Sequence, residues 1–280
     1  MPKPIRLAID GRGETTAWDT GPTANEKTLV LLHGWNVDTT LNFGAAIGRL
    51  AQHYRVVATD LHGHGVGHRS VAPFRIDECA RDVIAVADQL GIDRFTPLGY
   101  SLGGAIAQVL ARDFPERCDG VVLAATSARF NESRVERGQF AVVSGAAAGL
   151  RRSDPERGVV AKDRVFRSIV RAASARYPSW VKDIVLQGDP YALLDAGAEL
   201  GRFDSHDWLP QLTMPVAIVA TTGDRVVDPA RQRRLTELVA HSLLIELDSD
   251  HDAPINGNPQ YPVALLEAAH HATKRRIRAA

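Results

Sequence analysis

The chain has 280 residues and a formal net charge of zero, because 33 lysines and arginines balance 33 aspartates and glutamates. This balance argues against a nucleic-acid-binding protein, which needs a cationic surface for the phosphates, and a hydrophobic content of 45% argues against a disordered chain. The two cysteines, Cys79 and Cys118, are too few to cross-link a chain of this length and are expected to stay free thiols.

The first predicted elements, residues 5–9 and 15–18, are joined by the turn-like sequence DGRG and should form an antiparallel hairpin. Apolar runs without polar alternation follow, as expected of parallel strands that are buried on both faces. These predicted strands cover residues 28–32, 56–59, 95–98, 121–124, 216–220 and 243–247. Amphipathic helices are predicted between them, over residues 76–90 and 102–114. This alternation predicts an α/β fold in which helices wrap a parallel sheet.

The alternation stops between residues 128 and 210. Helix-forming and charged residues dominate there, and about 80 residues are too many for a simple connection. We interpret residues 128–210 as a helical insertion over one edge of the sheet. The remaining segments, residues 1–127 and 211–280, then form a single core, although at about 150 residues per domain the length alone also fits two domains.

The strongest motif lies between a predicted strand and a predicted helix. Residues 99–103 read Gly-Tyr-Ser-Leu-Gly and match the pattern G-x-S-x-G. A strand that turns abruptly into a helix strains the residue at the turn, and small residues two positions away on either side let the turn close. The hydroxyl of Ser101 then projects at the positive end of the helix. This context predicts that Ser101 is a nucleophile.

A serine hydroxyl is a weak nucleophile and needs a base, which in turn needs a group that orients it. Of the ten histidines, His251 follows the last predicted strand by a short loop, so it should lie at the carboxyl edge of the sheet with Ser101. Asp224 and Asp228 both follow the preceding strand. Asp224 is closer to the strand end, whereas Asp228 precedes a helix as an N-cap residue would. Asp224 is therefore the preferred orienting carboxylate, with Asp228 as the alternative.

Acyl transfer also needs donors for a developing oxyanion. The backbone N–H of Leu102, directly after the nucleophile, is one candidate. The N–H of Trp35, in the loop after the strand 28–32, is the other, because Gly34 permits a sharp turn there. His33 stands at the end of that strand, and a structural hydrogen bond is its expected role.

Three histidines in seven residues, His62, His64 and His68, suggest a metal site near Asp60. His62 and His64 are one residue apart on a glycine-rich loop, and no distant group of cysteines or carboxylates completes a ligand set. No metal is therefore expected.

Together these residues resemble the α/β-hydrolase superfamily. The matching segments are LLHGW at 31–35, DLHGHG at 60–65, GYSLGG at 99–104, GDRVVDP at 223–229, and His251. The resemblance implies an α/β-hydrolase fold, with a mostly parallel eight-stranded sheet flanked by helices and an inserted helical cap. It also implies a Ser-Asp-His hydrolase without metal or organic cofactor. The chain looks most similar to capped esterases, lipases and cofactor-free haloperoxidase-like perhydrolases.

The sequence departs from the family pattern in three places. His62 and Gly67 replace the arginine and serine of the usual D-x-R-G-x-G-x-S loop. Asp250, where a glycine is usual, precedes His251. Gly223 directly precedes Asp224, whereas the family usually has two residues between this glycine and the acid, which keeps Asp228 open as the acid.

The leading hypothesis is a hydrolase of a small to medium-sized, moderately apolar carboxylic ester. A perhydrolase, a thioesterase, and an amide or carbon–carbon hydrolase with the same triad are alternatives, as is a non-catalytic ligand-binding protein on this scaffold. Tyr100, Trp180 and Phe140 are the expected substrate-binding residues, because aromatic side chains next to the nucleophile and in the insertion can line an apolar pocket.

The N-terminal residues lack the apolar core of about 7–15 residues that a secretory signal needs. The least polar stretch, residues 140–150, is shorter than the roughly 20 residues of a membrane span. We therefore expect a cytoplasmic protein with a small-molecule substrate and no membrane span. The oligomeric state stays open, with a homo-oligomer among the alternatives.

Overall fold

The computed structural model of the chain describes residues 2–9, 11–153 and 179–274. Their eight strands form one sheet in the order β1-β2-β4-β3-β5-β6-β7-β8. The strands are, in chain order, β1 (Pro4–Ile9), β2 (Gly13–Asp19), β3 (Thr28–Leu32), β4 (Arg55–Thr59), β5 (Thr96–Tyr100), β6 (Val121–Ala124), β7 (Val216–Thr221) and β8 (Leu243–Leu247). β1 pairs with β2 and β2 with β4 in antiparallel fashion, and the other neighbours are parallel. The fold predicted from the sequence is confirmed.

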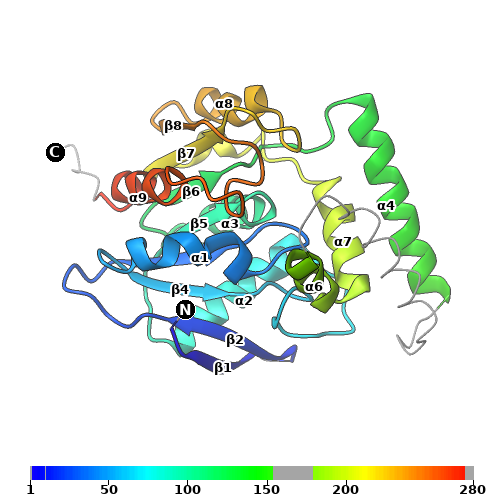
Figure 1. The fold of residues 1–280 in the computed structure, drawn as a ribbon, viewed down its shortest axis with the longest axis horizontal. Coiled ribbons are helices and arrows are strands. Elements are labelled where there is room, and N and C mark those ends of the chain that lie inside the picture. The colour runs from blue at the N-terminus through cyan, green and yellow to red at the C-terminus, as the bar shows by residue number, and fades with distance from the viewer. Residues whose placement is uncertain (1, 10, 154–178, 275–280) are drawn as a thin grey trace.

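Helices cover both faces of the sheet (Figure 1). One face carries α1 (Thr39–Leu50) and α9 (Tyr261–Ala272), which pack over a cluster that includes Phe43, Leu98 and Tyr261. The other carries α2 (Ile76–Gln89), α3 (Leu102–Asp113) and α8 (Pro229–Leu238), packed over a second cluster. Double coverage explains why the central strands have apolar residues on both faces: all residues of β3, β5, β6 and β7 are buried.

The strand order places a topological switch at β3. The chain runs from β3 outward to β4, and then returns to add β5 on the opposite side of β3. In open α/β sheets the carboxyl ends of strands at such a point border the ligand-binding crevice. The residues that follow β3 and β5 are those of the predicted oxyanion loop and of the G-x-S-x-G motif, so both emerge at this crevice.

One predicted boundary differs from the structure in an informative way. β5 begins at Thr96 and continues to Tyr100, whereas the apolar run predicts residues 95–98. Gly99 and Tyr100 extend the strand because β6 offers them pairing partners, Leu123 and Ala124. Phe95 lies outside the strand and forms only an isolated bridge with Cys118. Partner strands therefore fix an end that residue type does not mark.

The described residues between β6 and β7 include the α-helices α4 (Arg134–Ser153), α6 (Ser179–Gln187) and α7 (Pro190–Leu200). They gather at one end of the molecule, beyond the sheet (Figure 1). The two ends of this segment meet, because Arg129 and Asp204 form an isolated antiparallel bridge and the N–H of Ser205 donates to the carbonyl of Ala128 at 3.0 Å. The segment thus leaves and rejoins the core at a single point.

Cys79 and Cys118 are buried free thiols, as predicted. Burial raises the pKa of the Cys118 thiol to about 12, so this side chain behaves as a small apolar group. None of the helices that the structure describes is long and apolar enough to cross a membrane. The cytoplasmic location and the oligomeric state stay predictions.

Candidate active site

Ser101 occupies a strained turn between β5 and α3. Its φ of 54° and ψ of −113° are unusual for a residue with a side chain, and such a conformation costs about 1–3 kcal/mol. Glycines make the turn sterically feasible: a Cβ on Gly99 would overlap the backbone of Gly103, and a Cβ on Gly103 would overlap that of Leu32. The hydroxyl of Thr126 donates to the carbonyl of Ser101 at 2.8 Å and fixes the turn from the β6 side. The surrounding fold thus holds Ser101 in this conformation.

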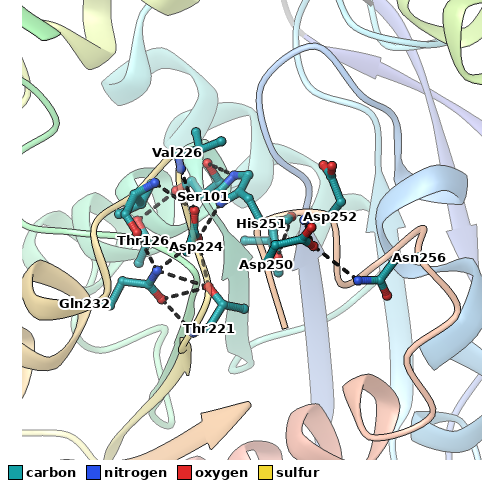
Figure 2. A network of polar contacts seen from close by, with 12 residues as sticks. Ser101, Thr126, Thr221, Asp224, Val226, Gln232, Asp250, His251, Asp252 and Asn256 are labelled. Atoms are coloured by element: carbon teal, nitrogen blue, oxygen red, sulfur yellow. Dashed lines mark hydrogen bonds and ion pairs between the residues drawn. The ribbon is translucent and has the colours of Figure 1, made fainter. Parts of the chain in front are cut away.

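His251 lies between Ser101 and Asp224 (Figure 2). Its Nδ1 is 2.7 Å from Oδ2 of Asp224, and its Nε2 is 3.2 Å from Oγ of Ser101. A carboxylate can only accept, so Nδ1–H donates to Asp224, which leaves Nε2 free to accept the hydroxyl proton of Ser101. These three residues come from the loops after β5, β7 and β8, and the structure brings them together as the sequence predicts.

The carboxylate of Asp224 is buried and densely hydrogen-bonded. Burial acts to raise its pKa, but the hydrogen bond and charge of His251, followed by the backbone N–H groups of Val227 and Val226, hold the pKa below its usual range. Both N–H groups donate to Oδ1, at 2.9 and 2.8 Å. Asp224 therefore stays ionised beside the imidazole, as an orienting carboxylate must.

Asp228 has a different position. It is the N-cap of α8, where its carboxylate accepts a hydrogen bond from the N–H of Ala230 at 2.7 Å. Between the two aspartates that the sequence leaves open, only Asp224 contacts His251. The carboxylate of Asp250, next to the histidine in sequence, bonds within its own loop, to the N–H of Asp252 and the amide of Asn256.

The loop after β3 approaches the nucleophile closely. A Cβ on Gly34 would lie 3.5 Å from Cβ of Ser101, and the N–H of Gly34 donates to Oδ1 of Asn42 at 2.7 Å. Within the described parts of the chain, the backbone N–H groups of Trp35 and Leu102 donate to no other group. Both N–H groups are therefore available to donate to an oxyanion formed next to Ser101.

His33 has the structural role that its position predicts. It is fully buried, its Nδ1–H donates to the carbonyl of Gly34 at 2.8 Å, and its Nε2 accepts from the N–H of Leu61 at 2.9 Å. Burial lowers its pKa to about 4. The neutral ring thereby ties the loop after β3 to the loop after β4.

The three clustered histidines are also packed in the interior. His64 Nδ1–H donates to the carbonyl of His62 at 2.9 Å, and the rings of His62 and His68 stack with centroids 4.7 Å apart. Burial lowers the pKa of His62 and His64 to about 3 and that of His68 to about 4. Among the residues that the structure describes, no set of three or more His, Cys, Asp or Glu side chains is arranged to hold a metal ion.

The three expected substrate-binding residues are placed differently. Tyr100 is 3% exposed and its hydroxyl donates to the backbone carbonyl of His251 at 2.9 Å, a position that favours support of the base over contact with a substrate. Phe140 on α4 packs against Gly201 at the end of α7, so it joins the two helices. The side chain of Trp180 lies outside the described residues.

Sequence reasoning missed several supporting side chains. Trp35 holds the insertion through its indole, whose Nε1–H donates to the carbonyl of Leu193 in α7 at 2.8 Å. Gln232, eight residues after Asp224, donates to the same carboxylate oxygen as His251. A glutamine inside a charged helix gives no local signal of such a role. The only signal is its spacing from Leu235, three residues later, which places both side chains on the buried face of α8.

The chain belongs to the alpha/beta hydrolase fold family, whose model matches residues 27–257. It is 28% identical over 234 residues to 3-oxoadipate enol-lactonase 2 of Acinetobacter baylyi, covering 79% of each chain. It is 30% identical over 253 residues to the pimeloyl-[acyl-carrier protein] methyl ester esterase of Nitrosomonas europaea, covering 88% of this chain and 96% of that one. Among solved structures, a hydrolase from Pseudomonas aeruginosa superimposes with a TM-score of 0.77 at 21% identity, covering 95% of this chain and 97% of that one. The family resemblance predicted from the motifs is confirmed.

Proposed function

We propose that this chain is a serine hydrolase that cleaves a small to medium-sized, moderately apolar carboxylic ester through an acyl-enzyme. The observation that carries the proposal is the continuous line of hydrogen-bonding groups from Asp224 through His251 to Ser101 on the strained turn. The names of two relatives, an enol-lactonase and a methyl ester esterase, support ester chemistry.

In the first half of the reaction Ser101 attacks the acyl carbon while Nε2 of His251 takes its proton. The ionised Asp224 stabilises the imidazolium that forms and keeps Nδ1 protonated. The backbone N–H groups of Leu102 and Trp35 donate to the tetrahedral oxyanion, and each such donor is worth about 3–4 kcal/mol of the barrier. His251 then returns the proton to the leaving alcohol oxygen.

In the second half water attacks the acyl-enzyme. His251 now accepts a proton from the water, and the oxyanion forms at the same two donors. Collapse of this intermediate releases the carboxylic acid and restores the hydroxyl of Ser101. The reaction needs no metal and no organic cofactor, because the side chains supply every proton transfer.

The insertion, residues 128–210, acts in this proposal as a cap that shapes the acyl pocket. α7 is anchored to the edge of the site at two points: the indole of Trp35 donates to Leu193, and the N–H of Asp189 donates to the carbonyl of Gly63 at 2.7 Å. Two buried or half-buried acids of α7, Asp195 and Glu199, accept hydrogen bonds from the N–H groups of Phe74 and Ile76 at the start of α2. These four hydrogen bonds hold α7 against the loops after β3 and β4 and against the segment that enters α2.

The test combines a covalent probe with a kinetic series. A fluorophosphonate should label Ser101, as mapped by peptide mass spectrometry, and p-nitrophenyl esters of short acyl chains should be hydrolysed faster than long ones. Ser101→Ala should abolish labelling and lower kcat by about 10⁶-fold. Ser242→Ala, at a serine just before β8 and so at the opposite end of the parallel strands from Ser101, is the matched control and should retain full activity.

Full ester hydrolysis by Ser101→Ala would contradict the assignment of the nucleophile. A protein that is labelled at Ser101 but hydrolyses no ester would favour another reaction of the same triad. Thioester and amide substrates, and hydrogen peroxide as the acyl acceptor, would then be tested. A folded protein that is neither labelled nor active, yet binds apolar ligands, would instead be a binding protein on this scaffold.

A further inference from the structure

The carboxylate of Asp224 is held at both oxygens. Oδ1 accepts the two backbone N–H groups of Val226 and Val227. Oδ2 accepts from Nδ1 of His251 at 2.7 Å, from the hydroxyl of Thr221 at 2.8 Å and from Nε2 of Gln232 at 2.9 Å (Figure 2). The oxygen that faces the base therefore has two other side-chain donors.

Gln232 is fully buried, which is costly for a primary amide unless its polar atoms are bonded. Its Oε1 accepts from the backbone N–H of Thr221 at 3.0 Å, and its Nε2 donates to the carbonyl of Val227 at 2.7 Å as well as to Asp224. A flipped amide would point its oxygen at a carbonyl and a carboxylate, so the network fixes one orientation. That orientation aims an N–H at Oδ2.

We propose that Gln232 is a positioning residue for the base, acting through Asp224; this inference rests on the proposed function. With two donors at Oδ1 and Gln232 and Thr221 at Oδ2, the carboxylate cannot rotate about its last bond. Oδ2 then stays in line with Nδ1 of His251, and Nε2 stays aimed at Ser101. Gln232 also draws charge from Oδ2, which limits how strongly Asp224 attracts an imidazolium.

A purely structural role is the competing explanation. Gln232 bridges the two ends of the segment between β7 and α8, because it bonds both Thr221 and Val227. Its loss would lower stability under either explanation. The two explanations differ in what happens to His251 in the folded enzyme, so the readouts must report on the imidazole.

The first measurement uses the unmodified protein. The side-chain amide protons of Gln232, assigned by NMR, should shift with pH at the same midpoint as the ring protons of His251, because the hydrogen bond through Asp224 couples them. The downfield Nδ1–H resonance of His251 should follow the same midpoint. Amide protons of Gln232 that do not respond to His251 would overturn the proposal, whatever the variants do.

The second measurement uses Gln232→Met and Gln232→Glu. Gln232→Met should lower kcat by about 10- to 100-fold with little change in KM, because the base is misaligned in a substrate-independent way. The acid limb of the kcat/KM profile should move to higher pH, since a carboxylate with one donor fewer attracts the imidazolium more strongly. Gln232→Glu should leave this limb near its native position, because a buried carboxyl this close to Asp224 retains its proton and donates it to Oδ2.

Gln89→Met is the matched control, at an exposed glutamine at the end of α2, and should leave both kcat and the acid limb unchanged. A folded Gln232→Met enzyme with the native kcat, acid limb and Nδ1–H resonance would reduce Gln232 to a structural residue. That outcome would leave the proposed function intact, because the loss of activity in Ser101→Ala tests it separately.

Discussion

Two histidines at the carboxyl edge of the sheet, His33 and His251, show how the same side chain takes two roles. His33 follows β3 and is fully buried, and both of its ring nitrogens form hydrogen bonds with backbone groups. His251 is half-buried and has a carboxylate at one nitrogen and a hydroxyl at the other. An imidazole with backbone groups at both nitrogens stays neutral and has a structural role. An imidazole that contacts an anion at one nitrogen and a hydroxyl at the other can accept a proton.

The environment of the first histidine extends through the loop after β4. His62, His64 and His68 are buried close to it, and the rings of His33 and His64 lie 5.2 Å apart. No anion compensates their burial well enough to keep them charged, so the pKa of each falls to about 3 or 4. The contrast teaches that histidine and aspartate content at the edge of a sheet does not mark an active site; the partners of the ring do.

Among the variants that test this comparison of histidines, the largest effect is expected from a change in Asp224, the carboxylate that contacts His251. Asp224→Asn keeps the shape of the side chain but removes its charge and offers an N–H where Nδ1–H must donate. We expect kcat to fall by about 10⁴-fold, as for the equivalent change in other triads. The comparison variant is Asp82→Asn, at a half-buried carboxylate whose Oδ2 lies 3.5 Å from Nε2 of the neutral His68. Asp82→Asn should retain the native kcat. Equal losses of kcat in both variants would refute the distinction between His251 and the neutral histidines.

A smaller effect concerns stability in acid. Burial is the main cause that lowers the pKa of His64 to about 3, whereas an unfolded histidine titrates near about 6.5. Between these values the unfolded chain binds a proton that the folded chain does not. The free energy of unfolding therefore falls by about 1.4 kcal/mol per unit as pH decreases through this window.

His64→Gln should remove this contribution, which urea unfolding at several pH values between 4 and 6 would detect as a shallower slope, by about 1.4 kcal/mol per pH unit. Burial raises the pKa of Asp82 to about 7, so this carboxyl titrates in the opposite sense, but its contribution cancels in the difference between variant and parent. Phe74→Leu, beside His64, is the control. It should lower stability equally at every pH, and an unchanged slope in His64→Gln would contradict the burial argument.

The smallest effect separates the two aspartates of the same loop. Asp228→Ala removes the N-cap of α8 and should lower the free energy of unfolding by about 1 kcal/mol with kcat unchanged. Thermal unfolding and ester kinetics on the same preparation check both parts. A large loss of kcat in Asp228→Ala would indicate that Asp228, and not Asp224, is the carboxylate that orients His251.

Local patterns in the sequence predict most of the fold. Buried runs mark the parallel strands, and the limits of β3, β6 and β8 agree with the predicted residues. The turn at Ser101 follows from Gly99 and Gly103, because only glycine fits where two backbones approach this closely. Asp224 and His251 follow from their places after consecutive strands, since parallel strands end at a common edge.

The supporting contacts could not be predicted in this way. The hydroxyl of Tyr100 bonds to His251, 151 residues further along the chain, and the indole of Trp35 bonds to Leu193, 158 residues away. Neither pair leaves a periodicity or a spacing to detect. The place of Tyr100 next to Ser101 predicts contact with a substrate. Side chains alternate between the two faces along β5, however, and that of Tyr100 lies in the cluster under α1 and α9.

The sequence by itself determined the family, the turn at Ser101 and the order of the three candidate catalytic residues, because each depends on residues that are neighbours in the chain or on strand ends that share one edge. Only the tertiary structure showed that Asp224 and not Asp228 contacts His251, how deeply the clustered histidines are buried, and that the amide of Gln232 donates to the carboxylate of Asp224. These outcomes depend on burial and on hydrogen bonds between distant segments, and such bonds exist only once the sheet and its helices have packed.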